Sequence, residues 1–287
     1  MLCNPKLISL LRKRNADALG VHISIARNAQ VVFLIRPTPQ ITLGGLELRD
    51  DGTLRTYTIV AGTCVYRGDQ FLEDARGNLF VPEAGGHLVG RLKLEGSGLT
   101  FDDKRFYPDD QELIASTDER FRPLNARTGP DGALYIADMY HGIIEHVIFM
   151  VPWVADQIKA RKLEEGNDLG RIWRIVYEDN PISRKAPQLS AAPVEQLIAA
   201  LDHPNGWWRD TAQRLLVDGG DASAIPLLNE FTREGKTHLG RMQALWALAG
   251  MDALGWDTAR VALADPHEYV RATALRGIAR HGAAVDA

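Results

Sequence analysis

The chain has 287 residues, of which 45% are hydrophobic and 24% are charged, and its formal net charge is −4. This composition is that of an ordinary globular protein and excludes wholesale disorder. The weak negative charge gives no electrostatic support for binding to nucleic acid or to an anionic membrane. No apolar run reaches about 18 residues, so no transmembrane segment is predicted.

The first twenty residues do not have the form of a signal peptide, because their basic residues follow the apolar stretch and no small-residue cleavage site comes after it. The two cysteines, Cys3 and Cys64, belong neither to a zinc motif nor to the C-x-x-C-H motif of a covalent haem site. A Cys3–Cys64 disulfide and two separate buried thiols are both open. The second is favoured because free cysteine is usually buried.

Residues from about 20 to 178 have the pattern of a β-rich domain, with frequent Gly and Pro and short apolar runs. Asp51-Gly52 and Asp131-Gly132 are hairpin turn signals, since glycine tolerates the positive φ of tight turns. Strands of ordinary length are predicted at Val31–Ile35, Leu54–Val60, Leu79–Val81, Leu88–Leu92 and Leu134–Ala137.

Two of these segments repeat one another. Gly77–Glu83 and Gly132–Asp138 each begin with a turn glycine, continue as an apolar strand and end on an acid, at an offset of 55 residues. A turn–strand–acid unit at this spacing is typical of β-propeller blades. Two unrelated hairpins of a β-sandwich are the alternative interpretation.

The end of this domain and a linker follow. Trp153–Leu163 is predicted to be an amphipathic helix, and Gly170–Tyr177 alternates as a strand does. Residues 179–193 form the predicted linker, because Pro181, Pro187 and Pro193 interrupt any helix there.

From about residue 190 the spacing is helical, and a better repeat appears in Arg209–Leu216, Arg241–Leu248 and Arg271–Ile278. Each unit has alanine three residues after its arginine and an aliphatic residue seven after it, which is typical of HEAT-type helix pairs. The arginines are expected to bond to neighbouring turns or carbonyls, and a peptide-binding ladder is the alternative. The pair Trp207 and Trp208 is expected to pack at the first unit rather than to form a ligand cage.

The strings Ser116–His146, Gly170–Arg174 and His203–Asp210 resemble one bacterial family. It comprises the large propeller–HEAT proteins of planctomycete-type bacteria, described as membrane-bound or sugar-dehydrogenase-like. Their propeller is similar to the soluble quinoprotein glucose and sorbosone dehydrogenases. The resemblance covers most of the chain. The secretion signal, earlier blades and haem domain usual in the family are not in this sequence, so we expect a partial chain or fragment.

The resemblance implies a multidomain β plus α fold. Residues 1–178 would form about three blades of a dehydrogenase-like propeller, and residues 194–287 a HEAT-type solenoid. The implied function is that of a sugar or polyol dehydrogenase, an oxidoreductase acting on CH–OH groups with pyrroloquinoline quinone and calcium. An electron-accepting cytochrome or other protein would dock on the helices, and the location would be periplasmic or secreted. The alternative is a non-catalytic scaffold that binds a glycan or a protein.

Hairpin geometry places the candidate ligand-binding residues. If Arg122–Thr128 and Leu134–Ala137 pair antiparallel, Arg120 and Arg122 lie near the end of the second strand. The same logic applied to the earlier repeat puts Tyr66, Arg67 and Asp69 beside Glu83 and His87. Arginine suits carboxylates, and an acid suits calcium or a hydroxyl proton. The predicted site is thus Arg67, Asp69, Glu83, Arg120, Arg122, Asp138, Tyr140 and His141.

Structural roles compete with this interpretation. Arg–acid pairs at strand ends often hold neighbouring elements together, and Asp138 would equally receive the N–H groups of the turn that follows it. His141 and His146 would suit a metal, but lone loop histidines seldom bind one. No residue is assigned a catalytic role, because none matches the quinoprotein enzymes position by position.

Overall fold

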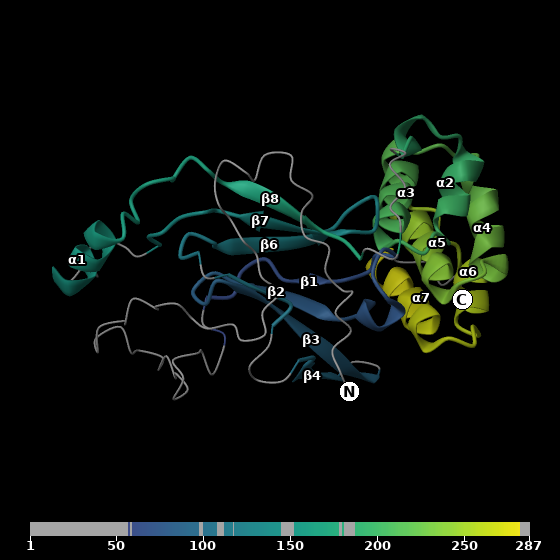
Figure 1. The fold of residues 1–287 in the computed structure, drawn as a ribbon. Coiled ribbons are helices and arrows are strands. Elements are labelled where there is room, and N and C mark those ends of the chain that lie inside the picture. The colour runs from purple at the N-terminus through teal and green to yellow at the C-terminus, as the bar shows by residue number, and fades with distance from the viewer. Residues whose placement is uncertain are drawn as a thin grey trace.

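The computed structural model describes residues 57, 59–97, 100–107, 112–116, 118–144, 152–177, 180 and 187–281. Figure 1 shows two β-sheets on one side of the molecule and an array of helices on the other. Two separate hydrophobic clusters correspond to these two parts, one among the strands and one among the helices.

The first sheet contains five antiparallel strands in the order β1-β2-β3-β4, with β5 pairing the start of β3. A single 3-10 turn, η2 (Glu73–Ala75), lies between β1 and β2. The tight turn after β2 brings Glu83 opposite Leu88. The strands are β1 (Cys64–Val65), β2 (Leu79–Glu83), β3 (Leu88–Ser97), β4 (Thr100–Arg105) and β5 (Ile114–Ala115).

The second sheet has three antiparallel strands, β6 (Pro123–Thr128), β7 (Leu134–Asp138) and β8 (Arg171–Ile175). The turn between β6 and β7 is the predicted Asp131-Gly132 turn: Gly132 has φ 77°, a conformation that glycine adopts without steric cost. The hairpin and the strand β8 are therefore confirmed. Helix α1 (Pro152–Ala160) lies between β7 and β8, where the amphipathic helix was predicted.

The predicted partial propeller is wrong. The two sheets are open, and they pack against each other through one shared cluster that includes Tyr66, Phe80, Ile136 and Trp173. In the described residues the strands form two open antiparallel sheets rather than similar blades arranged in a ring about a central channel. The turn–strand–acid repeat is real, but in the described residues it marks two hairpins of two packed sheets.

Several predictions fall outside the described residues, namely the strand Val31–Ile35, the Asp51-Gly52 turn, Cys3, His146 and most of Leu54–Val60. Cys64 is a half-buried free thiol whose Sγ lies 4.0 Å from Thr128 Oγ1. No helix in the described part of the chain is long and apolar enough to cross a membrane.

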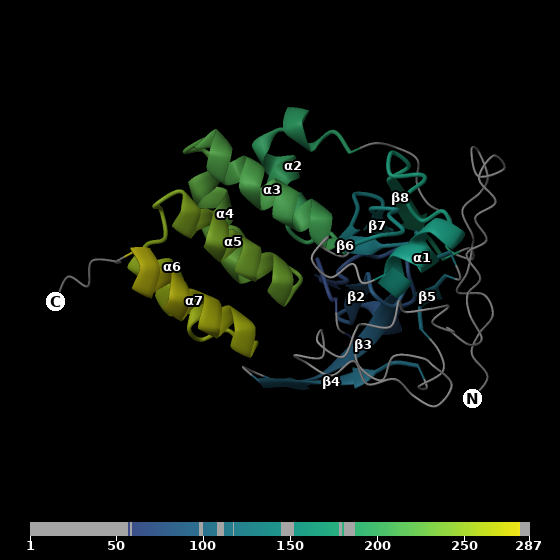
Figure 2. The same cartoon turned by 90° about the vertical axis from the view of Figure 1, so that its left-hand side faces the viewer.

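Residues after the linker are helical, as the spacing predicted. The short 3-10 turn η4 (Leu189–Ala191) leads into three antiparallel helix pairs, which we call the helical array. In Figure 2, α3, α5 and α7 lie side by side, and α2, α4 and α6 form the layer behind them. The helices are α2 (Val194–Ala200), α3 (Gly206–Gly219), α4 (Ala224–Glu234), α5 (His238–Gly250), α6 (Trp256–Ala262) and α7 (Glu268–His281).

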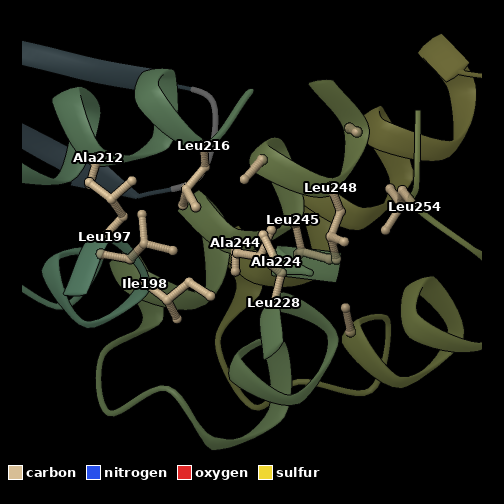
Figure 3. Close-up of a cluster of buried hydrophobic side chains, with 14 of the residues drawn as sticks. Leu197, Ile198, Ala212, Leu216, Ala224, Leu228, Ala244, Leu245, Leu248 and Leu254 are labelled. Carbon is tan, nitrogen blue, oxygen red and sulfur yellow. The ribbon is translucent and has the colours of Figure 1, made fainter. Parts of the chain in front are cut away.

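The repeated alanines explain the close packing of these helices. Ala212, Ala244 and Ala274 are each fully buried, and small residues at these crossings let the helix backbones approach. Aliphatic side chains fill the space between the pairs, and Figure 3 shows Leu245 and Leu248 pointing into this cluster. Side-chain caps fix where two of the helices begin, because Asn205 Oδ1 accepts from Trp207 N and Thr237 Oγ1 from Gly240 N.

The first turn of α3 is bonded directly to the sheets. Gly206 N donates to Arg67 O at 2.7 Å, and Asn205 Nδ2 donates to Gly129 O at 3.0 Å. Trp208 Nε1 donates to Pro130 O at 2.8 Å. The array is therefore joined to the β6–β7 turn and to the loop after β1 by main-chain carbonyls.

Candidate functional site

The acids that end β2 and β7 both bind backbone N–H groups of the turn that follows. Glu83 is fully buried and accepts from Gly85 N and Gly86 N, and also from Ile59 N at 2.8 Å. Asp138 Oδ1 accepts from Tyr140 N at 2.9 Å and from Arg122 N at 2.8 Å. These acids hold the chain reversal at each strand end.

Asp138 also fixes a tryptophan. Its Oδ2 accepts from Trp173 Nε1 of β8 at 2.9 Å, so the carboxylate joins three segments of the second sheet. Burial raises the pKa of Asp138, while these three donors and the charge of Arg171 oppose that rise. The carboxylate is thus enclosed by donors of its own chain.

Arg122 connects the two sheets. Its Nη1 donates to Ala84 O at 2.7 Å, in the turn after β2, and its Nε and Nη2 donate to His141 O and Gly142 O. Close to it, Phe121 O accepts from His87 Nδ1 at 2.9 Å. The strand ends of the two sheets therefore meet through an arginine and a histidine that both bond to main-chain oxygen.

The other predicted residues near the end of β7, Arg120, Tyr140 and His141, also bond to groups of the same chain. Arg120 donates to Glu165 O and Lys162 O, and His141 Nε2 lies 3.1 Å from Asn167 O. Tyr140 donates its hydroxyl to Asp118 Oδ2 at 2.9 Å, and the Arg171 guanidinium lies 3.6 Å from the centre of its ring. Burial raises the pKa of the Tyr140 hydroxyl.

The structure thus brings Arg120, Arg122, Asp138, Tyr140 and His141 together, as the hairpin geometry predicted. It does not bring Arg67 and Asp69 to Glu83. Val65 is paired with Leu79 at the start of β2, so the residues after Val65 lie at the end of β2 opposite to Glu83.

Arg67 and Asp69 lie instead at the junction with the helical array. The Arg67 guanidinium forms an ion pair with Asp210 of α3. The Asp69 side chain packs against Gly132. The contact is so close that a Cβ on that glycine would be 2.2 Å from Asp69 Oδ1. The predicted placement of Arg67 and Asp69 beside Glu83 is therefore wrong.

The arginines of the helical repeat bond to carbonyls, as expected. Arg209 Nη1 donates to His203 O, Arg241 Nη1 to Gly235 O and Arg271 Nη1 to Asp265 O, each six residues earlier. Each guanidinium therefore holds the turn that precedes its helix. Arg241 in addition pairs with both oxygens of Asp265, at 2.7 and 3.0 Å, which joins the second unit to the third.

A second candidate surface is the solvent-facing side of α5, which sequence reasoning missed. Leu239 is 36% exposed, and Met242 and Trp246 are only partly buried. Their spacing places all three on one side of the helix, while Ala244 and Leu248 face the core. The signal was visible in the sequence, since α5 is apolar on more than its core side. We call Leu239, Met242 and Trp246 the α5 face.

A polar border lies beside the α5 face. Gln243 Nε2 donates to Asp210 Oδ1 at 2.8 Å, and the same aspartate pairs with Arg67. A ligand lying across α5 would therefore contact apolar side chains in the middle and a fixed amide, acid and arginine toward α3.

The polar strand ends offer little to a cofactor. Within the described part of the chain, no three His, Cys, Asp or Glu side chains converge as metal ligands do. Glu83 and Asp138 are enclosed by N–H donors and Arg122 by carbonyls, so these groups do not fit calcium or the carboxylates of a quinone.

Comparison with known proteins places the chain in a family. Residues 10–179, more than half of the chain, match the family model described as Domain of unknown function (DUF7133). The chain belongs to this family. The DUF7133 match spans β1 to β8 and ends before the helical array. No curated protein and no solved structure matches the chain.

Proposed function

We propose that this chain is a non-catalytic binding module that docks a segment of another protein on the α5 face. The observation that carries the proposal is the contrast between the two candidate surfaces. At the strand ends the polar side chains bind the chain's own backbone, whereas the α5 face leaves apolar side chains partly open to solvent. Partly exposed apolar side chains gathered on one surface are typical of protein interaction sites.

The chemistry of the α5 face suits a peptide rather than a sugar. Leu239, Met242 and Trp246 present two flexible aliphatic groups and one large aromatic group. Methionine and tryptophan are favoured at protein interfaces, where they adapt to a partner's side chains and bury much area. Next to them, Asp210 and Arg67 offer charged groups that would fix the direction of a bound segment.

The sugar or polyol dehydrogenase implied by the family resemblance stays a prediction, as do its periplasmic location and its cytochrome partner. The strand-end residues support it poorly, because a substrate would have to displace the backbone groups that they hold. The binding proposal needs no such displacement.

The test is a peptide-display selection on the purified chain, followed by fluorescence anisotropy with the selected peptides. Leu239→Asp is expected to weaken binding at least about tenfold, since it places a charge in an apolar contact. The matched control is Leu72→Asp, because Leu72 is 38% exposed and lies in the sheet part, far along the chain from α5.

Two results would contradict the proposal. One is equal loss of peptide binding in both variants while both remain folded, which would locate binding elsewhere. The other is redox activity: the purified chain reduces an artificial electron acceptor when a sugar, pyrroloquinoline quinone and calcium are supplied. That result would support the dehydrogenase hypothesis instead.

A further inference from the structure

We propose that the segment docked on the α5 face is acidic at the end that lies over Trp246. Arg214 of α3 and Arg276 of α7 would bind its carboxylates, one from each side. This partner chemistry rests on the proposed function, because it concerns the same surface. All three residues hold one position of the helical repeat, five residues after the repeat arginine.

That position points away from the core in all three helices. The fully buried alanine of each unit stands two residues earlier, and two residues along a helix turn the side chain by about 200°. The exposures agree with this geometry. Arg214 and Arg276 are exposed, and Trp246 is partly exposed.

The two arginines lie on opposite sides of Trp246. Helix α5 packs against α3 on one side and against α7 on the other, as Figure 2 shows. Packed helices have axes about 8–10 Å apart, a spacing that a long arginine side chain spans in large part. A segment lying along α5 would therefore meet a guanidinium from each neighbouring helix at the level of Trp246.

Both arginines are available to a ligand. Arg276 has no carboxylate partner among the described residues. Arg214 pairs with Asp218, but both side chains are more than 60% exposed, and a pair this exposed exchanges for another acid at little cost. On the same side, Arg67 and Asp210 neutralise each other. The α5 face is thus bordered by at least one uncompensated positive charge, in a chain whose net charge is −4.

The other end of the α5 face has different neighbours. Two residues before the repeat arginine stand Trp207, Leu239 and Tyr269, one in each helix of the row. They lie two turns before the arginine-flanked position, on the same side of their helices. Leu239 is 36% exposed, and the two aromatic residues are partly exposed. This end is aromatic and aliphatic in all three helices.

The difference between the two ends defines the partner. A bound segment would place apolar side chains against Leu239 and Met242, and one or more aspartates or glutamates beside Trp246. The guanidinium group suits this role because its planar fork donates two parallel hydrogen bonds to a carboxylate. Such charged contacts at the border of an apolar surface set the direction and the choice of partner more than the affinity.

The experiment begins with peptide display on the purified chain. The probes are those selected peptides whose binding Leu239→Asp weakens, which we call the α5-face peptides. We expect aspartate and glutamate to be enriched on one side of their apolar residues. Replacing these acids with lysine should weaken binding, measured by fluorescence anisotropy, about tenfold, and added salt should reduce the difference.

A charge exchange then tests the two arginines. The double variant Arg214→Glu/Arg276→Glu should bind the acidic α5-face peptides about tenfold more weakly and should recover binding of their lysine versions. The matched control is Arg233→Glu/Arg260→Glu, which changes the charge equally. Both control arginines are exposed, and they belong to α4 and α6 in the layer behind. This control should change binding by less than about twofold.

The results separate this inference from the proposed function. If the α5-face peptides bind equally well with acids and with lysines, the acidic partner is wrong while the docking surface stands. The same holds if the Arg214→Glu/Arg276→Glu variant binds like the control. A selection that yields no α5-face peptides overturns both.

Discussion

The imidazole of His87 donates from Nδ1 to the carbonyl of Phe121 at 2.9 Å and so connects the first sheet to the segment that precedes β6. His87 is 2% exposed and has φ 55°, an uncommon conformation for a residue other than glycine. Burial, assisted by the charge of Arg122, lowers the pKa of His87 to about 4. The folded chain therefore keeps this ring neutral.

Stability should fall as the pH decreases from about 6.5 to 4. In the unfolded chain the ring takes up its proton near pH 6.5, whereas the folded chain resists it until about pH 4. Protons thus favour the unfolded state in this window, by about 3 kcal/mol in total. Urea unfolding at several pH values measures this. His87→Asn, which tolerates positive φ, should flatten the dependence. If the free energy of unfolding changed with pH equally in wild type and His87→Asn, His87 would not be the group responsible.

Replacing Asp138 with asparagine should destabilise the chain by about 1–3 kcal/mol. The carboxylate accepts from three buried donors, and an amide group cannot accept at its nitrogen, so either Trp173 or the turn after β7 loses its acceptor. The free energy of unfolding in urea tests this. Asp218→Asn is the control, because Asp218 is 61% exposed in its pair with Arg214 and its loss should cost less than about 0.5 kcal/mol.

Two glycines of α3 should respond in opposite directions to alanine. A Cβ on Gly206 would lie 2.8 Å from Arg67 Cβ, so Gly206→Ala should push α3 off the sheets and cost about 1–3 kcal/mol. Nothing lies within 4 Å of a Cβ on Gly219, and Gly219→Ala should stabilise the helix by up to about 1 kcal/mol. Thermal unfolding distinguishes them, and a stabilised Gly206→Ala would contradict the close approach.

Removal of Arg241 should cost more than removal of any exposed cation of the array. Its guanidinium pairs with both oxygens of Asp265, the two side chains being 13% and 7% exposed, and also binds Gly235 O. Arg241→Ala should therefore destabilise the array by about 3 kcal/mol, because it removes the ion-pair partner of the nearly buried Asp265 and leaves it only the N–H of His267. Arg214→Ala, at a pair exposed by more than 60%, should change stability by less than about 0.5 kcal/mol. A similar loss of stability in Arg241→Ala and Arg214→Ala would contradict the stabilising role of the Arg241–Asp265 pair.

Local features of this fold could be predicted from the sequence because they depend on neighbours in the chain. The Asp131-Gly132 turn fixes the β6–β7 hairpin, and the hairpin brings Arg122 to Asp138. The alanine spacing fixes the crossings of α3, α5 and α7. Each of these features follows from turn chemistry or helical periodicity over a few residues.

The arrangement of the sheets could not be predicted in this way. A strand that ends on an acid is equally consistent with a propeller blade and with an acid that holds its own turn, as Glu83 and Asp138 do. The place of Arg67 was missed because β1 has only two residues, too few to show a strand period or its register. Both errors concern how segments distant in sequence pack, which a periodicity does not encode.

The bonding of α3 to the sheets has a mechanical consequence. Gly206, Asn205 and Trp208 bond to the carbonyls of Arg67, Gly129 and Pro130, so a force on α3 is transmitted to the loop after β1 and to the β6–β7 turn at the base of this helix. A load on the helices would be carried in part by this hydrogen-bonded base, together with the Arg67–Asp210 ion pair.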